Sequence, residues 1–223
     1  MSQFDIYLEI GKKKTFACAV DWLGWCRSGK SEDAALEALL DYGKCYAEVM
    51  HHAGINFQAP GSIEGFRIIA KYEGNATTDS GAPRITPAVD KCLITEEERQ
   101  EYQKLLRACW QVFDEAVSYT EGKELRKGPR GGGRDLEKIV QHILEADLNY
   151  LKKQGQKIAK DQQGDLYIVR QAILETLQVA VNGEIPERGP RGGAMWSTPY
   201  FMRRVVWHIL DHAWEIEDRV FQN

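Results

Sequence analysis

The chain has 223 residues, of which 43% are hydrophobic and 28% are charged, as in a water-soluble globular protein with a sizeable core. Its net charge of −4 is spread evenly: residues 1–94 have 10 basic and 12 acidic residues, and residues 95–223 have 19 and 21. Neither part has the basic excess of a nucleic-acid-binding protein, and no apolar run approaches the ~20 residues that span a bilayer.

The cysteines and the first residues both predict a cytoplasmic protein. The five cysteines are odd in number and include no Cys-x-x-Cys pair, so we expect free thiols in a reducing compartment. The start, Met1 to Asp5, lacks the basic and apolar stretches of a signal peptide. Cys109 lies in a helical pattern and is expected in the core. No cysteine has a histidine close to it in sequence, which argues against a catalytic thiol.

Residues 1–75 predict a small α/β domain. Its expected elements are a strand at residues 4–10, a hairpin partner at 15–20, a loop at 21–29, a helix from a Ser31 cap to about residue 51, and a strand at 65–72. This order of elements is a ββαβ unit.

Part of this domain resembles the N-terminal half of the HicB-like antitoxin fold. The residues that carry the resemblance are Phe16 to Cys26, Gly29 to Ser31, and Ala34 to Ala38. Leu23 stands where that family usually has proline, and no DNA-binding segment is visible after the unit. The resemblance implies a HicB-like accessory domain.

A Gly-, Thr- and Pro-containing connector at residues 76–94 leads to a second domain, residues 95–223. The expected helices run from the Thr95 capping box to about Tyr119, from an Asp135 cap to about Lys153, from about Asp165 to Val181, and from a Thr198 cap with Pro199 as first residue. Connections of roughly 10–17 residues favour an up-down four-helix bundle, and a crossover arrangement is also compatible with them. The whole chain is therefore expected to be α+β.

Two of the five histidines, His208 and His212, are four residues apart in the last helix. This spacing places both imidazoles on one helix face, where they can bind a divalent metal. The alternative is a pair of hydrogen-bonded histidines inside a bundle. Of the remaining histidines, His142 lies at the flank of an apolar arc, so the helix pattern alone does not select it. His51 and His52 are adjacent and point to different sides.

The histidine of the second helix and the His-x-x-x-His pair of the last one resemble the DinB superfamily over residues 95–223. The segments that carry the resemblance are Ile139 to Leu144 and Arg204 to Glu215. The family's metal triad maps onto His142, His208 and His212. The resemblance implies one divalent metal ion, usually zinc or nickel, with an open coordination position. It also implies, as in several relatives, a transferase or isomerase that uses a low-molecular-weight thiol.

The pentapeptide Gly-Pro-Arg-Gly-Gly occurs at residues 128–132 and again at 189–193, before the two histidine-bearing helices. In an up-down bundle these helices are parallel, so both loops would lie at the same end, one to three turns from the metal. The hypothesis is that Arg130, Arg134 and Arg191 bind the anionic groups of a small ligand there. The alternative is a pair of mobile loops with solvated arginines.

Two acidic residues also require an interpretation. Glu215 shares the stripe of His208 and His212, so it could orient a ligand or move a proton, or it is an ordinary surface acid. Asp147 lies at the centre of an apolar arc, where a buried carboxylate needs a partner such as a metal-bound histidine or an arginine.

Two functions are compatible with the sequence. The first is a metal-dependent enzyme, a transferase that activates a low-molecular-weight thiol, with hydrolysis as the chemical alternative. The second is a non-enzymatic binding or regulatory protein with a structural metal and a HicB-like domain that docks a partner. Three histidines without an obvious fourth ligand favour the first, because structural zinc sites usually have four protein ligands. The expected partner is a small molecule, with no nucleic acid and no membrane, and Trp-rich faces are compatible with a homodimer.

Overall fold

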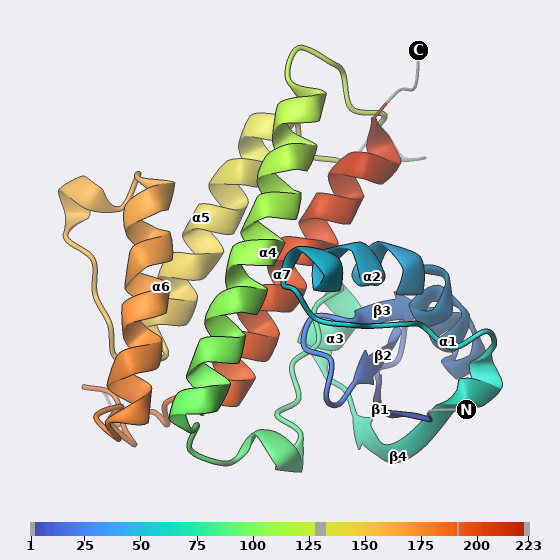
Figure 1. Cartoon of the computed structure of the whole chain (residues 1–223), viewed down its shortest axis with the longest axis horizontal. Coiled ribbons are helices and arrows are strands. Elements are labelled where there is room, and N and C mark those ends of the chain that lie inside the picture. Colours follow the sequence, from blue (N-terminus) through green and yellow to red (C-terminus); the bar gives the residue numbers. More distant parts are fainter. Residues whose placement is uncertain (1–2, 128–132, 191, 221–223) are drawn as a thin grey trace. The chain divides into compact units, whose positions relative to one another are not determined.

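The computed structural model describes residues 3–127, 133–190 and 192–220, and it has the expected mixed α+β class (Figure 1). The described residues form a four-stranded sheet and seven α-helices. Two compact units divide at Lys91 and Cys92, inside the expected connector. Among the described helices, none combines the length and apolar character that a membrane span requires.

The sheet belongs to the first unit and has the strand order β3-β2-β1-β4. Its strands are β1 (Phe4–Ile10), β2 (Thr15–Ala19), β3 (Cys26–Gly29) and β4 (Phe66–Glu73). β1 is antiparallel to β2 and parallel to β4. The predicted strands β1, β2 and β4 are confirmed. The prediction of a loop at residues 21–29 is wrong in its second half, because β3 pairs with β2 from Cys26 to Gly29.

The expected helix after Ser31 is two helices, α1 (Glu32–Asp41) and α2 (Gly43–His52). The Ser31 hydroxyl accepts from the amide of Ala34 at 3.2 Å, so the predicted cap is confirmed. Tyr42 leaves helical geometry between the two helices. The resulting turn places Tyr46 of α2 in a stacked contact with Trp25, 5.7 Å between ring centroids. Packing of this aromatic core therefore breaks a segment that is helical by its local pattern.

Glu9 of β1 is a fully buried carboxylate that binds the segment after β4. Its oxygens accept from the backbone N–H groups of Arg84 at 2.8 Å and Ile85 at 2.9 Å, and from the Thr78 hydroxyl of the short helix α3 (Ala76–Ser80). The carboxylate thus satisfies backbone donors that would otherwise be without acceptors.

Glu9→Gln is therefore expected to lower the free energy of unfolding of the first unit by about 1–2 kcal/mol, because an amide N–H₂ would face backbone donors. Urea unfolding of the full chain measures this, with Glu37→Gln on the exposed face of α1 as the matched control. Equal stability of the two variants would contradict the prediction.

The second unit contains the four longest helices. They are α4 (Glu96–Thr120), α5 (Leu136–Lys152), α6 (Leu166–Val181) and α7 (Thr198–Arg219). The capping box at Thr95 is confirmed, with Thr95 Oγ1 accepting from the Glu98 amide and the Glu98 carboxylate from the Thr95 amide. The Asp135 cap is also confirmed, and Asp165, expected as the approximate start of the third helix, is the cap of α6. α7 begins one residue earlier than expected, with Ser197 in the cap position and Thr198 already helical.

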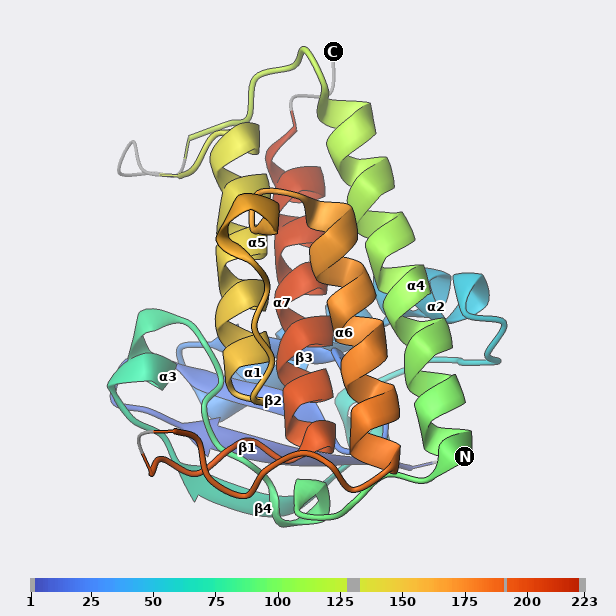
Figure 2. The same ribbon diagram turned by 90° about the vertical axis from the view of Figure 1, so that its left-hand side faces the viewer.

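The helix directions differ from the expected up-down order. The Trp196 amide donates to the Lys153 carbonyl at 3.0 Å, so the end of α5 meets the beginning of α7. Arg219 Nη2 donates to the Arg134 carbonyl at 2.8 Å, so the end of α7 meets the beginning of α5. α5 and α7 are antiparallel, and α6 runs in the same direction as α5 after a returning connection (Figure 2). The prediction that α5 and α7 are parallel is therefore wrong.

α7 is buried on nearly all sides and packs against α4 and α5. Among its buried residues are four that can carry charge, namely Arg203, Arg204, His208 and His212. Because a buried polar group needs a partner, these four side chains require polar or charged groups around α7.

Candidate metal centre

Three histidine side chains converge between α5 and α7. Nε2 of His142 lies 3.2 Å from Nε2 of His208, and one nitrogen of each ring, including His212, lies within 4.8 Å of the others. His208 and His212 are 5% and 6% exposed, and His142 is half-buried. The structure thus brings together the three residues named from the sequence, while His51 and His52 are exposed at the end of α2.

The arrangement of the three rings fits the demands of a divalent metal. Two nitrogens that each lie about 2.0 Å from one ion at the tetrahedral angle are about 3.3 Å apart, close to the distance between His142 and His208. The alternative for this pair is a hydrogen bond between the two Nε2 atoms. Among the described residues, this group consists of three side chains that can bind a metal, which is the number of protein ligands found in catalytic zinc sites.

The protonation state of the histidines also suits metal binding. Burial lowers the pKa of His208 well below its ordinary value, and the charges of neighbouring histidines act in the same direction. Burial likewise lowers the pKa of His142, with a further contribution from the positive charge of Arg134. Both imidazoles are therefore neutral at pH 7, the form in which their nitrogens bind metal ions.

His212 is oriented by a carboxylate on its own helix. Its Nδ1 lies 2.7 Å from Oε2 of Glu215, which leaves Nε2 for the side that faces the other histidines. The hydrogen bond with His212 lowers the pKa of Glu215 although burial opposes it, so this side chain is ionised at pH 7. Glu215 is therefore engaged with a histidine of the centre and is not an ordinary solvated acid.

A buried arginine and aromatic rings cover the His208 side of the centre. Arg204 Nη2 donates to the hydroxyl of Tyr150 at 3.1 Å, and its guanidinium lies 4.8 Å from the Trp207 ring centroid. The Tyr150 ring is 5.9 Å from that of His208. Sequence reasoning did not assign Arg204 to the site. The only indication in the sequence was that Arg204 is a charged residue in a helix that is apolar almost all round.

Of the three arginines expected to bind a ligand, Arg134 is described, and Arg130 and Arg191 lie outside the described residues. Arg134 is exposed at the beginning of α5, and its charge influences both His142 and His208. The expected single rim of two Gly-rich loops is wrong. The second loop leads into the beginning of α7, which meets the end of α5 through the hydrogen bond from the Trp196 amide to the Lys153 carbonyl, whereas the first loop leads into the beginning of α5. The cause is the antiparallel packing of α5 and α7.

Asp147 of α5 is fully buried but has no bonded partner of the expected kind. Neither carboxylate oxygen has a hydrogen-bond partner among the described residues. Burial raises the pKa of Asp147 to about 7, against the lowering effect of the Arg170 charge. The Arg170 guanidinium itself binds Asp114, at 2.6 and 2.7 Å. The expectation of a direct histidine or arginine partner is therefore wrong.

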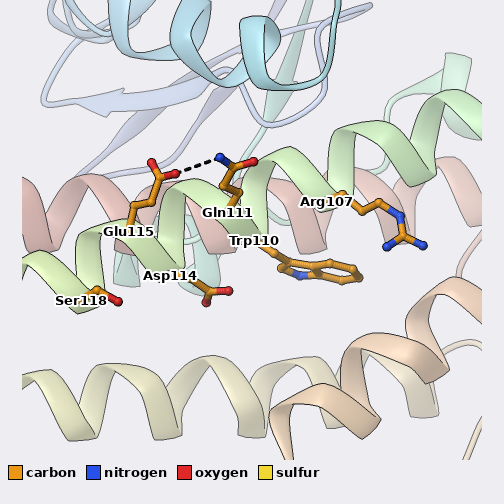
Figure 3. A pocket seen from close by; sticks show the side chains of 6 residues that line it. All are labelled: Arg107, Trp110, Gln111, Asp114, Glu115 and Ser118. Carbon is orange, nitrogen blue, oxygen red and sulfur yellow. Dashed lines mark hydrogen bonds between the residues drawn. The ribbon is translucent and has the colours of Figure 1, made fainter.

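A surface pocket of about 480 Å³ lies along α4 (Figure 3). Its lining residues are Arg107, Trp110, Gln111, Asp114, Glu115 and Ser118. The Gln111 amide donates to Glu115 at 2.9 Å, the interaction drawn in the figure. The lining contains neither histidine nor cysteine, so this pocket is distinct from the histidine cluster.

The five cysteines do not add a ligand to the centre. All five are free thiols, as predicted, and Cys109 is buried in α4. Burial raises the pKa of the Cys109 thiol, so it is protonated and unreactive at pH 7.

No family model, curated protein or solved structure matches the chain. The function is therefore inferred from the geometry of the described residues.

Proposed function

We propose that residues 95–223 form a DinB-like four-helix bundle in which His142, His208 and His212 hold one divalent metal ion, zinc or nickel. The observation that carries the proposal is the convergence of three imidazoles from two helices, with 3.2 Å between Nε2 of His142 and Nε2 of His208. The lowered pKa values of His142 and His208 support it, because protons compete weakly with a metal for such rings.

The reaction class that this centre suits best is S-transfer, in which the thiolate of a low-molecular-weight thiol attacks an electrophile. When bound, a divalent ion lowers the pKa of a ligating thiol or water. The neutral ligands His142 and His208 leave the charge of the ion uncompensated. We expect the exposed side chain of Arg134, whose positive charge acts on His142 and His208, to pair with a carboxylate of the ligand. Tyr150 and Trp207 limit the access of water from the His208 side.

The second candidate is a non-enzymatic binding or regulatory protein, in which the metal is structural and a HicB-like domain docks a partner. The observation that favours it is β4, which is an edge strand of the sheet. Ile68 and Ile69 on this strand are 40% and 46% exposed. An edge strand with exposed apolar side chains can accept an added strand from a partner.

Metal analysis of protein purified without chelator and without an affinity-tag metal tests the first candidate. We expect about one equivalent of zinc or nickel, followed by turnover in a screen of thiols with electrophiles. Metal without thiol turnover would favour the second candidate. Absence of metal, together with no thermal stabilisation by added zinc, nickel or manganese, would contradict the metal site itself.

A further inference from the structure

The side chain of Arg219, at the end of α7, connects the histidine cluster to the segments around it. Nη1 lies 2.5 Å from Oε1 of Glu215, the carboxylate that holds His212. Nε donates to the carbonyl of Arg126 at 2.9 Å, and Nη2 donates to the carbonyl of Arg134 at 2.8 Å. One guanidinium thus binds the carboxylate behind His212 and two backbone carbonyls of the α4–α5 connection.

The backbone before α5 is shaped to allow this approach. Gly133 has φ +129°, a conformation that L side chains rarely adopt. A Cβ atom at this position would lie 2.6 Å from Arg219 Nη2, which is held by its other hydrogen bonds. Glycine therefore permits the contact between the end of α7 and the beginning of α5, the helix that carries His142.

We infer that Glu215 and Arg219 are positioning residues of the metal centre. Glu215 keeps His212 in the tautomer with a proton on Nδ1 and Nε2 directed to the other histidines, and Arg219 holds both Glu215 and the start of α5. Carboxylates that accept from the second ring nitrogen of a metal-binding histidine fix its orientation and raise its basicity. The inference rests on the proposed metal site.

Zinc affinity, measured by competition with a chromophoric chelator, tests both residues. We expect affinity to fall about 10- to 100-fold in Glu215→Ala and in Arg219→Lys, the range found for partners behind metal ligands. Lysine keeps the charge, but its single nitrogen cannot reach the three separate acceptors that Nε, Nη1 and Nη2 of Arg219 bind. Glu215→Gln keeps an acceptor oxygen and should lose less than the alanine variant. The matched control is Glu145→Gln, which removes an exposed carboxylate near His142 that bonds Gln141 and no histidine; its affinity should stay within about threefold.

A second variant changes neither a ligand nor a hydrogen-bonding side chain. Gly133→Ala should displace the Arg219 guanidinium and weaken zinc binding in the same direction as Arg219→Lys. Unchanged affinity in Gly133→Ala and in Arg219→Lys would show that Arg219 has no positioning role.

The tautomer of His212 separates a positioning role from a general effect on stability. In ¹⁵N-histidine NMR spectra at pH 8, wild type should show His212 protonated on Nδ1 with and without zinc. Glu215→Ala should shift it toward protonation on Nε2, while the signals of His51 and His52 stay unchanged. Zinc binding by wild type together with equal affinity and the same tautomer in Glu215→Ala would overturn the inference alone. Failure of wild type to bind zinc would overturn the proposed function, and the metal-free spectra would still decide the role of Glu215.

Discussion

His208→Ala is expected to reduce the bound divalent metal from about one equivalent to near none. Nε2 of His208 lies 3.2 Å from Nε2 of His142, and the side chain is 5% exposed, so the substitution would remove the most buried of the three proposed ligands. Loss of a direct ligand should exceed the roughly 100-fold loss that follows removal of a partner behind one. Metal analysis beside zinc competition measures the change.

The matched control for this prediction is His52→Ala, which removes an exposed imidazole at the end of α2. It should keep the full equivalent of metal. His142→Ala and His212→Ala should behave as His208→Ala does, because each would leave two ligands of the three. Retention of one equivalent in all three variants would place any bound metal outside this cluster.

Asp147→Asn is expected to stabilise the protein above pH 7 and to have little effect near pH 4. Burial raises the folded-state pKa of Asp147 to about 7, whereas an unfolded aspartate titrates near 3.9. Between about pH 4 and pH 7 the folded state therefore binds more protons than the unfolded state, so this group lowers stability as the pH rises. Above pH 7 the full cost of a buried, unpaired carboxylate is present.

The asparagine variant removes this titration. Its gain in the free energy of unfolding at pH 8 should be about 2–4 kcal/mol from a difference of about three pKa units, and it should decline steadily toward pH 4. Urea unfolding at a series of pH values measures the difference from wild type. Asp161→Asn, which changes an exposed aspartate in the short 3₁₀ helix Lys160–Gln162, is the control and should show no such trend. A gain for Asp147→Asn that does not depend on pH would contradict the prediction.

Features that depend on residues a few positions apart were predictable from the sequence. The capping box of Thr95 and Glu98 and the cap at Asp135 use side chains within three residues of the groups they bind, and both occur in the structure. The same holds for His208 and His212, because the pitch of one helix places them one turn apart. His142 was harder to predict, because the pattern of α5 alone did not select it. It was named as a candidate ligand only through the resemblance to the DinB superfamily.

Features that depend on distant residues were not predictable in this way. β3 forms because Cys26 to Gly29 pair with β2, and α1 ends at Tyr42 where the aromatic core forms. α5 and α7 are antiparallel, as shown by the hydrogen bonds between Trp196 and Lys153 and between Arg219 and Arg134. None of these contacts can be recognised in the local sequence pattern. Local propensity permits several arrangements equally, and burial and strand pairing select one of them.

By itself, the sequence determined the four longest helices, most strands and the pair of histidines one turn apart, since these follow from helix pitch, strand alternation and local caps. Only the tertiary structure decided which side chains surround them. It brought Nε2 of His142 to 3.2 Å from Nε2 of His208. It also brought Arg219 to the carboxylate of Glu215, which binds His212. It also placed the beginnings of α5 and α7 at opposite ends of this helix pair, because antiparallel packing of α5 and α7 is a property of the whole unit and not of either helix.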